Sequence, residues 1–159
     1  IQKNFMQNQK SREKRILAKL NLDKLPYELK EGSFKDLGAR ISNFIHQVFL
    51  MQQNTKSINW CFANIKKAKI FFLIFHANEN GKQIYKEEIS KKLPEYSYKT
   101  ISKIIDEGIE KGHFILLSTD GETGKDSKIK NIRPSEELVS DFLNLGIEII
   151  SYISKEQLK

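Results

Sequence analysis

The stretch of sequence that decides the fold covers residues 97–134, SYKTISKIIDEGIEKGHFILLSTDGETGKDSKIKNIRP. Its first part predicts a helix that begins at residue 97 or 98 and ends at Lys111, because isoleucines recur on one side at helical spacing. Gly112 follows, as glycine commonly does just past a helix end. Residues 114–117 and 128–133 then predict two strands joined by a polar loop. A helix that leads directly into a β-hairpin is therefore expected.

Three helices are predicted upstream of this stretch. Apolar residues recur every three or four positions over residues 33–51, which predicts the first helix. Residues 58–77 predict the second helix, which ends at the turn sequence of residues 78–81. A short helix over residues 85–93 follows, and Pro94 interrupts it.

The sequence after the hairpin predicts a long helix from Ser135 to about Lys155. Ser135 is a suitable N-cap, and Glu136 and Glu137 suit the positive end of the helix. Apolar residues cover more than the usual third of its surface, so this helix is expected to be buried on more than one side. The simplest second surface is a partner subunit. The residues expected at that interface follow heptad spacing, and they are Leu138, Phe142, Leu145, Ile149 and Tyr152.

Length and charge favour one globular domain with an anionic partner. The 159 residues suffice for one sizeable core, with residues 1–32 predicted as a basic N-terminal extension and residues 33–159 as a single domain. A net charge of +7 favours DNA, RNA or an acidic surface. The many Lys, Ile and Asn residues also fit AT-rich codons, so the position of the charge matters more than its sum.

Several other classes of function are disfavoured. The longest apolar run, Ile70–Phe75, is far shorter than the roughly 20 residues that a membrane span needs. No apolar leader segment is apparent, and Cys61 is the only cysteine, so we expect a cytoplasmic protein with a buried structural thiol. His46, His76 and His113 are widely separated, and no Cys/His spacing indicates zinc. With no nucleophile and base at suitable spacing, we expect neither an enzyme nor a metal or other cofactor.

The predicted order of elements over about residues 68–134 is typical of a winged helix-turn-helix, within a mainly α fold that carries a small β-hairpin wing. The second helix of such a pair fits the major groove of DNA, which is about 12 Å wide, and the hairpin reaches a neighbouring groove or backbone. Cations and hydroxyls gather at both places. The residues expected to contact double-stranded DNA are Ser97, Tyr98, Lys99, Thr100, Lys103, Lys125, Lys128, Lys130 and Arg133.

The motifs in this region resemble the MarR-type (multiple antibiotic resistance regulator) family. Residues 100–106, TISKIID, followed by Gly112, are similar to the family's recognition-helix signature, Thr-Val-Ser-Arg-Ile-Ile-Asp and then Gly. Residues 88–90, EIS, stand where the family has Glu-Leu-Ala. Residues 126–128, DSK, resemble the wing's Asp-x-Arg, and residues 132–135 resemble the entry to the next helix. The resemblance covers about residues 81–143.

Three residues depart from the family pattern. Lys128 replaces the wing arginine, and lysine lacks the planar fork that suits a narrow minor groove. Gly108 stands where a core leucine is usual, with the neighbouring Ile109 as the expected compensation. Tyr85 replaces a capping threonine.

The resemblance implies a homodimer whose N- and C-terminal helices, about residues 33–55 and 135–157, interlock. It also implies a regulator, usually a repressor, that binds a pseudo-palindromic promoter site and responds to a small-molecule effector. The first of these helices would contribute Phe34, Leu37 and Ile41 to the interface. Two other functions stay open: a winged-helix module that docks a protein, and a DNA-binding replication or partition factor.

Overall fold

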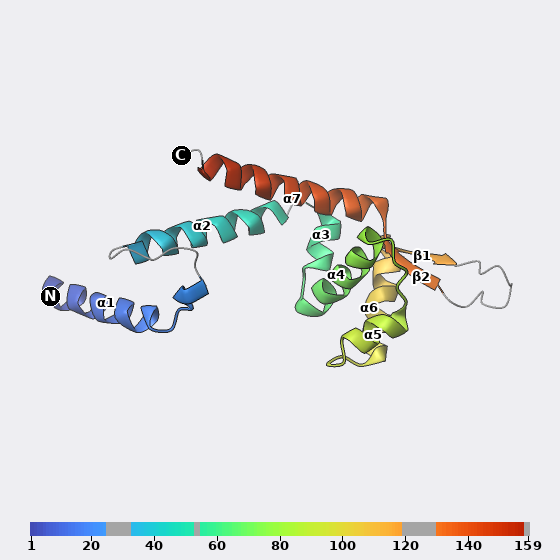
Figure 1. Ribbon diagram of the computed structural model, residues 1–159, viewed down its shortest axis with the longest axis horizontal. Helices are drawn as coiled ribbons and strands as arrows, with labels where there is room; N and C mark the ends of the chain where they lie inside the picture. The colour runs from blue at the N-terminus through green and yellow to red at the C-terminus, as the bar shows by residue number, and fades with distance from the viewer. Residues whose placement is uncertain (25–32, 53–54, 119–129, 158–159) are drawn as a thin grey trace. The chain divides into compact units, whose positions relative to one another are not determined.

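The computed structural model describes residues 1–24, 33–52, 55–118 and 130–157 (Figure 1). The chain divides into two compact units, Ile1–Val48 and Phe49–Lys159. The fold is mainly helical with one two-stranded antiparallel hairpin, which confirms the expected fold class at this level. Within the described ranges, no helix is long and apolar enough to cross a membrane.

The N-terminal unit contains α1 (Gln2–Leu17), the short 3-10 helix η1 (Leu22–Lys24) and most of α2 (Ser33–Gln52). The helix predicted from residue 33 is confirmed as α2. The helix α1 occupies about half of the basic extension predicted for residues 1–32. Residues 2–15 contain no Gly or Pro and many good helix formers, so intrinsic propensity extends the helix where apolar periodicity gives no signal.

The predicted helix over residues 58–77 is wrong as a single element. The structure has two helices there, α3 (Lys56–Cys61) and α4 (Ile65–Glu79). Asn64 between them is extended, and its side chain accepts a hydrogen bond from the Lys67 amide at 2.9 Å. An asparagine N-cap satisfies a free amide of the new helix, so the chain can turn here without leaving that group unpaired.

The next elements confirm the predicted order. They are α5 (Lys86–Lys92), α6 (Tyr98–Glu110), β1 (Phe114–Ser118) and β2 (Lys130–Pro134). The helices α5 and α6 pack against each other. Gly112 takes a positive φ of 79° between α6 and β1, a conformation that glycine adopts without strain.

The hairpin is tied to the loop between α4 and α5 through Ile84. The Ile132 amide donates to the Ile84 carbonyl at 3.0 Å, and the Asn131 side chain accepts from the Ile84 amide, also at 3.0 Å. Asn131 is 2% exposed, so this amide side chain takes the place of a strand partner inside the protein. The hairpin is therefore fixed to the helical part by more than its own strand pairing.

The last helix, α7 (Glu136–Gln157), begins at the predicted cap, where Ser135 Oγ accepts from the Leu138 amide at 3.1 Å. Ser57 of α3 donates to Asp141 of α7 at 2.7 Å and is itself buried. One apolar cluster joins α3, α4, α6, both strands and the first half of α7, and its largest fully buried side chain is Phe71. This core holds α6 against the rest of the unit.

Gly108 marks the closest packing in this core. A Cβ added there would overlap with the ring of Phe114 and lie 2.9 Å from Trp60 Cη2. The rings of Trp60 and Phe114 meet edge to face at 5.6 Å between centroids. These two rings fill the space beside Gly108, and Ile109 is partly buried against the same core. Gly108 is thus a packing requirement.

We predict that Gly108→Ala destabilises the protein by about 1–2 kcal/mol, because overpacking costs about 1–3 kcal/mol and the gain in helix propensity returns less than about 1 kcal/mol. Gly146→Ala is the matched control in α7, since nothing lies within 4 Å of an added Cβ there. The control is expected to gain about 0.5–1 kcal/mol. Urea unfolding at fixed protein concentration measures both, and stabilisation by Gly108→Ala would contradict this packing.

Candidate nucleic-acid interface

The outer face of α6 forms a shallow hollow, and its lining residues run along the length of the helix. It carries Tyr98, Lys99, Ser102, Lys103, Asp106, Glu107 and Glu110. Tyr98 is 47% exposed, and Lys99 and Lys103 are also exposed. Within the described part of the chain, no ion pair forms at either lysine. The start of α6 therefore presents free cations to solvent.

Two hydroxyls predicted to contact DNA, those of Ser97 and Thr100, stabilise the start of α6. Ser97 Oγ accepts a hydrogen bond from the Thr100 amide at 3.1 Å, and the two hydroxyls lie 2.9 Å apart. Ser97 thereby caps α6 and fixes its first turn. The Tyr98 hydroxyl lies 3.5 Å from Glu87 of α5, a loose contact that leaves the ring at the surface. The cap therefore fixes the backbone of the first turn, which carries Lys99.

Asp106 is paired with a cation from α5. Lys86 Nζ lies 2.6 Å from Asp106 Oδ1 and 3.1 Å from Ser102 Oγ. This pair joins the two helices and offsets one negative charge in the middle of α6. Nothing in the local sequence indicates it, because the two residues stand 20 positions apart.

Glu107 is held from the inner side of the helix. Trp60 Nε1 donates to Glu107 Oε1 at 2.8 Å, and Lys67 Nζ lies 3.5 Å from the same oxygen. The hydrogen bond from Trp60 lowers the pKa of the Glu107 carboxyl, and the charge of Lys67 lowers it further. Lys67 also lies over the Trp60 ring, 4.6 Å from its centroid. Glu107 is thus part of the scaffold that orients α6, a role the sequence did not indicate.

The hairpin cations are only partly placed. Arg133 is exposed and stands opposite Ile115 in the register of the two strands. Lys130 pairs with Ser118, so positions 130 and 133 fall on opposite faces of β2. Lys125 and Lys128 lie outside the described residues. The structure therefore brings the predicted residues of α6 together but does not test the tip of the hairpin.

The apolar residues of α7 divide into two faces. Leu138 and Leu145 belong to the core, with 0% and 8% exposure, and the Phe142 ring packs 4.7 Å from that of Phe75. Ile149 also packs against the core, and Tyr152 is partly buried. The heptad positions thus face largely inward. The apolar side chains that α7 leaves exposed are Leu143, Ile147, Ile150 and Ile153.

On α2, the predicted interface residues differ in exposure. Ile41 is 49% exposed, whereas Leu37 is partly buried. Phe34 lies in the first turn of α2, and its side chain is outside the description. Ile45 and Phe49 continue the exposed apolar line at intervals of four residues. This line suits a helix that needs a partner surface.

Cys61 is fully buried, which confirms the prediction of a structural thiol. Burial raises the pKa of the Cys61 thiol to about 12, despite the opposing charge of Lys67. Among the described residues, no group of three His, Cys, Asp or Glu side chains could hold a metal ion.

Comparison with protein-family models, curated proteins and solved structures finds no significant match for this chain. Its function has to be inferred from its own residues and their geometry. The clearest functional feature is the start of α6, where a capped and firmly packed helix carries an aromatic ring and two cations toward solvent.

We predict that Cys61 in the native protein does not react with a soluble disulfide reagent at pH 8. With a pKa of about 12, roughly one thiol in ten thousand would be ionised, and the side chain is also inaccessible. Unfolding in guanidinium should release one reactive thiol per chain, and Cys61→Ser should release none. Rapid reaction of the native protein would show that the thiol is accessible and would contradict its structural role.

Proposed function

We propose that the second unit is a winged helix-turn-helix that binds double-stranded DNA with α6 in the major groove. An α-helix with its side chains is about 10–12 Å wide, which suits a groove about 12 Å wide. Two observations carry the proposal. Lys99 and Lys103 at the start of α6 are exposed and form no ion pair with any described residue. Asp106 and Glu107 are held by partners on other helices. Without those partners, the carboxylates would repel phosphate.

The hairpin supports the same proposal. It leaves the helical part beside α6 (Figure 1), and hydrogen bonds at Ile84 fix its base. Arg133 is an exposed cation of β2 close to that base. A hairpin in this place serves as the wing, which would contact phosphate or the adjacent groove while α6 lies in the major groove.

At the level of biology, we propose a dimeric transcriptional regulator of the MarR type that acts at a pseudo-palindromic promoter site. This step rests on the sequence resemblance and on the exposed apolar stripe of α7, which runs from Leu143 to Ile153 at intervals of three and four residues. Two-fold symmetry would place half-sites about 10–10.5 base pairs apart, or a multiple of that distance. Repression and response to a small-molecule effector belong to the same proposal.

We predict that Lys99→Ala combined with Lys103→Ala lowers affinity for duplex DNA and reduces the slope of log K against log salt by about 1.8, since each neutralised phosphate contributes about 0.9. Lys111→Ala is the control, because this exposed lysine lies at the opposite end of α6. Mobility-shift titrations at two or more salt concentrations measure the slope.

Selection from random duplexes completes this test. A regulator should enrich a palindromic sequence. Salt-dependent binding without an enriched palindrome would favour a replication or partition factor. Absence of duplex binding would overturn the proposal and favour a module that docks a protein.

We predict that Ile147→Glu combined with Ile150→Glu converts the protein to a monomer without unfolding it. Both side chains are more than 60% exposed, at 62% and 64%, so the charges disturb the core little but oppose burial against a second subunit. Sedimentation equilibrium gives the mass, and thermal unfolding checks the fold. A dimer that persists in this variant would place the interface elsewhere, and a monomeric parent protein would contradict the dimeric regulator.

A further inference from the structure

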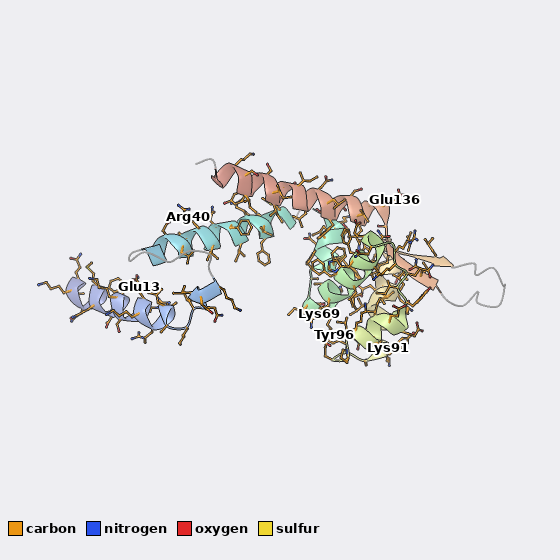
Figure 2. The ribbon with its side chains drawn as sticks, viewed as in Figure 1. Glu13, Arg40, Lys69, Lys91, Tyr96 and Glu136 are labelled. Atoms are coloured by element: carbon orange, nitrogen blue, oxygen red, sulfur yellow. The ribbon has the colours of Figure 1, made fainter. Side chains whose placement is uncertain are left out.

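A second group of cations lies around Tyr96, two residues before the first residue of α6. The sequence motifs did not predict these cations as DNA contacts. Lys66 and Lys69 on α4 are one helical turn apart, so they share a face of that helix. Both approach the ring of Tyr96, with their ammonium nitrogens 5.6 Å and 5.5 Å from its centroid. Figure 2 shows Lys69 and Tyr96 side by side. Two positive charges are therefore gathered around one aromatic side chain.

The position of Tyr96 relates this group to the proposed DNA-binding face. Tyr96 immediately precedes Ser97, the N-cap of α6, and its own amide donates to the Leu93 carbonyl at 3.1 Å. Lys99 follows only three residues later. Lys66 and Lys69 thus lie beside the same end of α6 that carries the free lysines. A duplex seated on the start of α6 would bring its backbone near them.

The carboxylate of Glu95 would compete with a bound anion for Lys69. Its Oε1 lies 2.8 Å from Lys69 Nζ, and the two side chains are 42% and 44% exposed. The hydrogen bond with Glu95 raises the pKa of the Lys69 ammonium and lowers that of the Glu95 carboxyl. Because this pair is open to solvent, it is weak enough for a phosphate to replace the carboxylate. Lys66 forms no ion pair among the residues that the structure describes.

We propose that Lys66 and Lys69, gathered on the Tyr96 ring, form a second phosphate-contact site that extends the duplex footprint beyond α6, and that Glu95 competes with phosphate for Lys69. This inference rests on the proposed DNA-binding function. A phosphate backbone is the partner because the site offers flexible ammonium groups and a phenol, which suit a tetrahedral anion and contain no fixed fork for base edges. The site adds affinity at any sequence.

The experiment compares three changes in the 159-residue chain on two duplexes of unrelated sequence. Lys66→Ala combined with Lys69→Ala should weaken binding by roughly tenfold per lost contact near 0.1 M salt and reduce the salt slope by about 1.8. Glu95→Gln should tighten binding by about two- to fivefold, which is the competition an exposed ion pair of this kind provides. Lys111→Ala is the control and should match the parent protein. Far-UV circular dichroism and thermal unfolding check that each variant is folded.

The result separates this inference from the proposed function. If the double variant binds within twofold of the parent protein while loss of Lys99 and Lys103 weakens binding strongly, DNA binding stands and the second site is overturned. If Glu95→Gln weakens binding, the competition is overturned. If the parent protein binds no duplex, both the function and this site fail. Equal loss of affinity for unrelated duplexes supports a phosphate contact, and a change in sequence preference contradicts it.

Discussion

The close approach of Gly108 to the rings of Trp60 and Phe114 is the constraint on which the rest of the second unit depends. It seats α6 on the rings that α3 and β1 contribute, with no side chain from position 108 in between. One residue earlier, the carboxylate of Glu107 accepts a hydrogen bond from Trp60 Nε1. The helix can therefore neither rotate nor move outward without losing aromatic contact or leaving the Trp60 donor without its partner. Its outer face is consequently fixed.

That placement also decides the electrostatics of the outer face. Asp106 and Glu107 follow Lys99 and Lys103 closely in the sequence, and the four formal charges cancel. In the structure, Lys86, Lys67 and Trp60 hold the two carboxylates. The cations nearer the start of α6 have no such partner among the described residues, and Lys66 and Lys69 add to them from α4. Positive charge is thus concentrated at one end of the helix.

The sequence predicted the elements between residues 85 and 155 well, because each has a clear period and a local stop signal. Gly112 ends α6, and Ser135 begins α7. The break at Asn64 was missed because apolar residues continue on both sides, so periodicity alone gives no boundary. Heptad spacing on α7 predicts a subunit interface, but a helix that packs on the core of its own subunit shows similar spacing. Leu138 and Leu145 fill the monomer's own core instead.

The sequence by itself determined the order of elements, the capped start of α6 and the cations there, because these depend on residues within a few positions of each other. Only the tertiary structure decided which charges remain available, since the partners of Asp106 and Glu107 stand 20 to 47 residues away. It also decided that Gly108 is required, that Asn131 is buried against Ile84, and that Lys66 and Lys69 lie beside Tyr96. The physical reason is common to all of them. Packing brings side chains that are distant in the sequence within contact distance, and the local spacing of residues does not predict such contacts.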